Sequence, residues 1–210
     1  MIKRVLKENL IFIILLIIMI LSFSVYFNSN VSTLINNFDS KTSVFFSNFI
    51  DTKLTTIFKI ITFFGDIYIP IIIIMCTFLL IKNKNYFYIL IGSYIFSGAI
   101  TFASKIVINR ARPVDSIIPY PDKFSFPSGH TLTSMVFYFM LCYLLTYKKN
   151  KKTKIITYIL TMIFIFLIGL SRVYLKVHYF SDVIGGLLIG IITLFIIINF
   201  INENIKEKLL

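Results

Sequence analysis

The amino-acid sequence predicts an all-α, polytopic membrane protein with six transmembrane helices. The chain has 210 residues, of which 58% are hydrophobic and 14% are charged, and its mean hydropathy is +0.89. A soluble domain has roughly 45–50% apolar and about 25% charged residues. The apolar residues also gather into long runs, and a helical span needs about 20 of them. Because these runs use most of the chain, we expect a single membrane-embedded domain over residues 1–210.

The expected spans are six apolar runs separated by short polar segments. They cover about residues 9–27, 56–81, 86–107, 130–147, 155–170 and 183–201. The first run follows a basic segment and so also fits a signal peptide. It is longer than a signal core, however, and no small-residue cleavage site follows it, so we interpret it as a span. Gly65, Asp66 and Pro70 predict that the outer part of the second run is irregular.

A mixed segment over residues 28–53 lies between the first two spans. It carries apolar residues near helical spacing, namely Val44, Phe45, Phe46, Phe49 and Ile50. That spacing is compatible with an interfacial helix lying on the membrane. It is equally compatible with a helical extension of the next span, and the sequence leaves both interpretations open.

The basic residues predict the orientation of the chain in the cell membrane. Six spans place both termini on one side, and with the termini in the cytoplasm twelve of the 21 Lys and Arg residues lie inside in short segments, as the positive-inside rule expects. These twelve are Lys3, Arg4, Lys7, Lys82, Lys84, Lys148, Lys149, Lys151, Lys152, Lys154, Lys206 and Lys208. The net charge of +12 is therefore a topology signal, and we expect no nucleic-acid partner.

Three polar stretches emerge together on the predicted extracytoplasmic face. They hold Lys105 and Arg112, then the turn Pro127-Ser128-Gly129-His130, then Arg172, His178 and Asp182. Charges in hydrocarbon are costly, so cations at span ends must share water or an anion. Three of them, Lys105, Arg112 and Arg172, can form a pocket for a tetrahedral dianion. The alternative is interfacial snorkelling, which we expect for Lys123 and Lys176.

The two histidines of the chain suggest the chemistry of this face. A metal site needs three or four suitable ligands, which these segments do not supply, so we expect no metal and no cofactor. His178 and Asp182 are four residues apart and share a helix face, which makes His178 the expected nucleophile with Asp182 as its partner. His130 follows a turn at a helix start and suits a general acid. The backbone N–H groups of Ser128, Gly129 and His130 can hold phosphate oxygens.

These motifs resemble the three signatures of the type-2 phosphatidic-acid phosphatase superfamily. The matching residues are Lys105-x6-Arg112-Pro113, Pro127-Ser128-Gly129-His130 and Ser171-Arg172-x5-His178-x3-Asp182. The resemblance implies a six-helix membrane fold and metal-independent dephosphorylation through a phosphohistidine. It also implies that Lys105, Arg112 and Arg172 bind phosphate together with Ser128 and Gly129, and it gives His130, His178 and Asp182 the catalytic roles inferred above. The pair Gly65-Asp66 resembles one often found in membrane members of the family.

The sequence therefore predicts an integral-membrane lipid phosphatase. Bacterial members of similar size, as the resemblance implies, act on polyprenyl diphosphates such as undecaprenyl diphosphate, on phosphatidylglycerol phosphate or on phosphatidic acid. Two alternatives stay open at this point. A lipid phosphotransferase would use the same site residues with an acceptor other than water, and a non-catalytic anion transporter would use only the cations.

Overall fold

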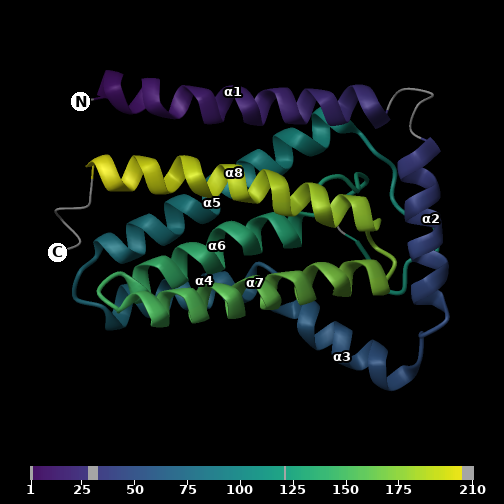
Figure 1. Cartoon of the computed structure of the whole chain (residues 1–210). Coiled ribbons are helices and arrows are strands. Elements are labelled where there is room, and N and C mark those ends of the chain that lie inside the picture. The colour runs from purple at the N-terminus through teal and green to yellow at the C-terminus, as the bar shows by residue number, and fades with distance from the viewer. Residues whose placement is uncertain (1, 28–32, 121, 205–210) are drawn as a thin grey trace.

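The computed structural model confirms an all-helical, polytopic fold. It describes residues 2–27, 33–120 and 122–204, and within these ranges there are helices and loops but no strand. Lys206 and Lys208 lie outside the described residues, as does the start of the mixed segment at 28–32. The helices are α1 Ile2–Phe27, α2 Thr33–Ser47, α3 Thr52–Phe63, α4 Tyr68–Leu80, α5 Asn85–Ile108, α6 Gly129–Thr146, α7 Lys151–Tyr174 and α8 Phe180–Asn204 (Figure 1).

Helix α6 lies at the centre of the helix bundle. It packs against α5, α7 and α8, while α1 lies outside against α8 and α5, and α3 packs on α7 (Figure 1). The side chains of Leu132, Val136, Phe137 and Met140 in α6 are fully buried. Burial of such side chains inside a bundle whose outer helices expose many apolar residues is the pattern of a protein that contacts lipid on its outside.

Four of the helices are long and apolar enough to cross a membrane, counted over the described residues. They are α5, α6, α7 and α8, and the pair α3 and α4 makes a fifth if it is one bent span. In α1 the apolar stretch searched, Asn9–Val25, is shorter than the other four. All six predicted spans fall on helices, and the count of six spans stays a prediction.

The second predicted span is broken where the sequence predicted irregularity. Helix α3 ends at Phe63 and α4 begins at Tyr68, with a bend of 41° between them. The break brings Gly65 against His130, because a Cβ atom added at Gly65 would lie 3.0 Å from the imidazole Cδ2 of His130 and 2.7 Å from Ile168 Cγ2. Only a glycine gives the backbone this close approach to the imidazole ring without displacing a neighbour.

Helix α2 is separate from the span that follows it. Asp51 caps α3 by accepting hydrogen bonds from the N–H groups of Lys53 and Leu54, so α3 starts anew after α2 has ended at Ser47. An unbroken extension of the next span is therefore wrong. Helix α2 runs across the ends of the bundle helices (Figure 1). Its location at the membrane surface stays a prediction.

Tight packing between α8 and the start of α6 brings the polar segments together. A Cβ atom added at Gly186 of α8 would lie 2.9 Å from the carbonyl oxygen of Ser128 and 3.2 Å from Thr131 Cβ. The carbonyl belongs to the backbone and cannot rotate away as a flexible side chain could. Glycine at this position therefore sets how closely α8 approaches the turn before α6.

We predict that Gly186→Ala lowers the stability of the purified protein by about 1–3 kcal/mol, because the new methyl group is forced against backbone. Gly98→Ala in α5 is the matched control, since nothing lies within 4 Å of the added Cβ there. Both changes raise helix propensity equally, so the difference between them reports packing. Thermal unfolding in detergent measures it, and equal melting temperatures for the two variants would contradict the packing argument.

Candidate active site

The predicted polar stretches meet at one end of the bundle. The ends of α5 and α7 and the starts of α6 and α8 lie there, and α2 crosses beside them (Figure 1). His178 lies in the short loop between α7 and α8, and Asp182 lies in the first turn of α8. His178 and Asp182 are both buried. The three polar stretches, which the six-span topology predicted on one side of the membrane, thus lie together at one end of the bundle.

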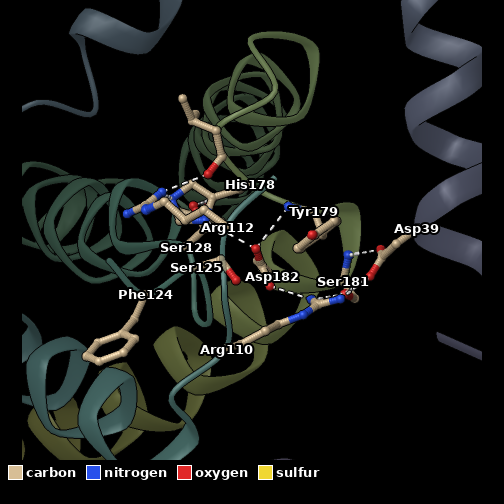
Figure 2. Close-up of polar contacts among 12 residues, drawn as sticks. Asp39, Arg110, Arg112, Phe124, Ser125, Ser128, His178, Tyr179, Ser181 and Asp182 are labelled. Atoms are coloured by element: carbon tan, nitrogen blue, oxygen red, sulfur yellow. Dashed lines mark hydrogen bonds and ion pairs between the residues drawn. The ribbon is translucent and has the colours of Figure 1, made fainter. Parts of the chain in front are cut away.

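The imidazole of His178 bridges a carboxylate and an arginine. Its Nδ1 lies 3.3 Å from Asp182 Oδ2, and its Nε2 lies 3.1 Å from Arg112 Nη1 (Figure 2). An arginine can only donate, so Nε2 is the acceptor and Nδ1 carries the proton that faces Asp182. The lone pair of Nε2 therefore points at the cations. The predicted pairing of His178 with Asp182 is present, but the two residues do not share a helix face, because His178 lies in the loop before α8.

Burial sets the charge state of His178. It lowers the pKa of His178 well below the usual 6.5, and the nearby positive charges of Arg172, Arg112 and Lys105 lower it further. His178 is consequently a neutral imidazole at neutral pH. A neutral imidazole, whose Nε2 carries a lone pair, is the form that a nucleophile requires.

Lys105 and Arg112 converge on a carboxylate that the sequence analysis gave no role. Asp122 lies 2.9 Å from Lys105 Nζ through both of its oxygens, and its Oδ1 accepts from Arg112 Nη2 at 2.8 Å. Partial burial raises the pKa of Asp122, but the hydrogen bonds from Lys105 and Arg112 outweigh it and leave the pKa below its usual 3.8. The charged carboxylate shows that these two cations are placed to hold one anion between them.

Arg172 and His130 each keep a buried polar atom without a hydrogen-bond partner. Arg172 Nη1 donates to Thr62 Oγ1 at 2.7 Å, while its Nε has no hydrogen-bond partner. The Nε2 of His130 also lacks one, and the nearest carboxylate oxygen in an ion pair is Asp66 Oδ1 at 3.9 Å. The nearby charges of Arg172, His178, Lys105 and Arg112 act on His130, so these five predicted site residues share one electrostatic environment.

The turn before α6 differs from the prediction in one respect. The N–H of Ser128 donates to the carbonyl of Asp182 at 3.0 Å, and its hydroxyl accepts from Thr131 Oγ1 at 2.9 Å. The backbone N–H of Ser128 is thus used to join α6 to α8 and is not available to phosphate, contrary to our expectation. Gly129 and His130 lie in the first turn of α6, where N–H groups have no acceptor within the helix.

Two further differences concern charged residues near the site. Lys176, which we expected to snorkel, forms an ion pair with Asp115. The sequence analysis gave Arg110 no role, yet its Nη1 donates to Asp182 Oδ1 at 2.6 Å and its Nη2 donates to Asp39 at 2.7 Å. The only signal for Arg110 in the sequence is its place two residues before Arg112. Nothing in the sequence points to Asp39, which lies mid-helix in α2.

The described residues contain no group of three or more His, Cys, Asp or Glu side chains that could hold a metal ion. The polar groups that do converge are cations, two imidazoles and amide N–H groups at a helix start. This donor set suits an anion with several oxygens rather than a metal.

The chain is similar to known proteins both in sequence and in fold. The profile of the PAP2 superfamily matches residues 86–206. Phosphatidylglycerophosphatase B of Bacillus subtilis (strain 168) is 36% identical over 105 residues, which are 48% of this chain and 50% of that protein, so the match spans about half of each.

Two crystal structures are similar in fold. One is described as the first transmembrane PAP2 type phosphatidylglycerolphosphate phosphatase, from Bacillus subtilis, with a TM-score of 0.78 and 24% identity over 91% of this chain and 96% of that one. Aquifex aeolicus LpxE has a TM-score of 0.61 and 25% identity over 75% of this chain and 93% of that one.

We predict that His178 titrates below pH 6.5 in the folded protein and that Arg112→Gln moves its pKa up toward that value, because one of the repelling charges is removed. The unfolded chain takes up this proton near its usual pKa, so stability falls as pH drops below about 6.5. NMR of ¹⁵N-histidine-labelled protein measures the titration, since the chain has only two histidines. Asp115→Asn is the control, and a His178 pKa at or above 6.5 would contradict the assignment.

Proposed function

The chain belongs to the PAP2 superfamily, and we propose that it is an integral-membrane phosphatase that hydrolyses a lipid phosphate monoester or diphosphate through a phosphohistidine. The observation that carries the proposal is the orientation of His178. Its Nδ1 proton faces Asp182, and its Nε2 lone pair faces Arg112. A nucleophilic nitrogen therefore points to the place where cations hold an anion.

The phosphate group of the substrate would bind among three cations. Lys105 and Arg112 already hold a carboxylate between them, and a phosphate bound by both takes the place of the Asp122 side chain. Arg172 brings a buried Nε–H that has no hydrogen-bond partner among the described residues. Charge-assisted bonds to phosphate oxygens are stronger than neutral ones, and here they would neutralise the charge that spreads over the oxygens in the transition state.

The reaction then has two steps that share one pair of histidines. His178 Nε2 attacks phosphorus, the bond from phosphorus to the leaving oxygen breaks, and His130 gives that oxygen a proton. Asp182 stabilises the positive imidazole ring through the Nδ1 proton. Water next attacks the phosphohistidine while His130 takes up its proton, and free phosphate and neutral His178 result. Gly129 offers its N–H to a phosphate oxygen in both steps.

The nature of the substrate is inferred from the location of the site. The site lies at the end of a bundle whose outer surface is apolar, so a headgroup can reach it while its acyl or prenyl chain stays beside the helices. We propose phosphatidylglycerol phosphate, phosphatidic acid or undecaprenyl diphosphate as substrates, with the active site on the extracytoplasmic face and both termini in the cytoplasm. The matched relative from Bacillus subtilis supports the first of these.

We predict that the purified protein in detergent releases phosphate from at least one of these three lipids and that EDTA leaves the rate unchanged. A panel of the three lipids with and without EDTA measures this. Absence of release from all three would overturn the proposal, and release that EDTA abolishes would overturn the metal-free mechanism. Mass spectrometry of the lipid products separates hydrolysis from transfer to an acceptor lipid. Sealed right-side-out vesicles test the side of the site, because substrate in the outer leaflet must then be turned over.

We also predict that His178→Gln abolishes turnover and that Asp182→Asn lowers kcat by at least about 100-fold, because each removes a part of the nucleophile. After a rapid quench with radiolabelled substrate, the unaltered protein should carry an acid-labile, alkali-stable phosphate that His178→Gln lacks. Asp115→Asn serves as the control, since its ion pair with Lys176 is exposed to solvent. Full turnover by His178→Gln would rule out the phosphohistidine.

A further inference from the structure

A second ion-pair network lies directly behind Asp182, and the steps above make no use of it. Arg110, in the loop that follows α5, donates from Nη1 to Asp182 Oδ1 at 2.6 Å and to the hydroxyl of Ser181 at 2.7 Å. Its Nη2 donates to Asp39 Oδ2 at 2.7 Å. Figure 2 shows Asp182 between His178 and Arg110, with Asp39 and Ser181 at the far end of the guanidinium group.

Asp39 of helix α2 is hydrogen-bonded both to this arginine and to the start of α8. Its Oδ1 accepts from the N–H of Ser181 at 2.9 Å, and its Oδ2 accepts from the Ser181 hydroxyl at 2.5 Å. The Asp39 side chain is only 2% exposed. A buried carboxylate is costly unless it is paired and fully hydrogen-bonded, and Asp39 meets that condition only in this arrangement with Arg110 and Ser181.

The guanidinium group of Arg110 is also held from both faces. Its central carbon lies 4.3 Å from the ring centre of Phe27 and 4.1 Å from that of Tyr179. Arg110 and these two rings also border a cavity of about 380 Å³, whose lining includes Asp39 and Asn36. A long side chain beside such a cavity has room to change rotamer. The two rings and Asp39 are what keep it in place.

We propose that Arg110 is a positioning residue for the reaction, held by Asp39 of α2, and that it acts through Asp182. Arg110 occupies Oδ1, which leaves Oδ2 for the N–H of Tyr179 at 2.9 Å and for His178 Nδ1. A rotation of the carboxylate away from His178 would break the bond to Arg110. The guanidinium also balances a second negative charge, since Asp39 and Asp182 are both buried beside it.

Part of this ion-pair network lies outside the region that the family profile matches. The PAP2 profile match begins at residue 86, whereas Asp39 and Phe27 belong to α2 and α1. Helix α2 thus contributes to the reaction of this chain through the carboxylate network, without touching the phosphate-binding cations. The inference rests on the proposed function for its kinetic readout.

A double-mutant cycle tests the proposal. We expect Arg110→Gln to lower kcat by about 10–100-fold while KM changes less than about twofold, because the phosphate-binding cations are untouched. In an Asp182→Asn background the same change should cost less than about threefold, since Arg110 then has no carboxylate to position. Asp39→Asn should act in the same direction, and Arg110→Lys should retain more activity than Arg110→Gln. Asp115→Asn is the control and should leave kcat unchanged.

A second readout does not depend on turnover. In ¹⁵N-histidine spectra, Asp39→Asn and Arg110→Gln should shift the Nδ1 resonance of His178 and leave that of His130 in place. Equal losses in both backgrounds, a loss confined to KM, or an unmoved His178 resonance would overturn the proposal. If Arg110→Gln fails to fold, Asp39→Asn is used for both the kinetic measurement and the ¹⁵N-histidine spectra. If no lipid phosphate is hydrolysed at all, the proposed function fails while the spectra still decide whether Arg110 positions Asp182.

Discussion

Most of the charged side chains at the active end of this bundle are paired with one another, because the site is built where apolar helices end. Asp182 is completely buried, and it is stable there because it accepts from Arg110 and Tyr179 and faces the Nδ1 of His178. Asp122 meets the same need for Lys105 and Arg112. Removing one partner of a buried pair leaves an uncompensated charge, so these contacts hold one another in place. The geometry of the site follows from this mutual requirement.

The sequence predicts the spans and the signature residues well, because both depend on local signals. Each predicted apolar run falls on helix, although one run forms the two helices α3 and α4. His178 and Asp182 pair as predicted, although His178 lies in a loop and not on the helix of Asp182. The break in the second span was also visible, in Gly65 and Asp66. The role of this break could not be predicted, because the contact of Gly65 with His130 forms only when the break packs against α6.

Contacts between distant segments could not be predicted in this way. Asp39 and Ser181 are 142 residues apart, and nothing in the composition of α2 marks one of its few charged side chains as buried. The bond from the Ser128 N–H to the Asp182 carbonyl likewise depends on how closely α8 approaches the turn before α6. A single sequence shows which groups can donate or accept, but only the packing of helices decides which of them meet. Arg110 illustrates this, since the sequence analysis gave it no role and the fold makes it a partner of two carboxylates.

The unsatisfied atoms of His130 and Arg172 have a consequence for the energy of the whole protein. A buried N–H or ring nitrogen without a partner costs about 1–3 kcal/mol, and evolution usually removes such atoms from a core. Here two of them lie in the same electrostatic environment as the nucleophile, so the protein without ligand is less stable than its packing alone would allow. An anion that supplies the missing hydrogen bonds completes the fold as well as occupying the site. Ligand binding therefore adds to the free energy of unfolding of this bundle, and the rise in melting temperature measures how fully the site is occupied.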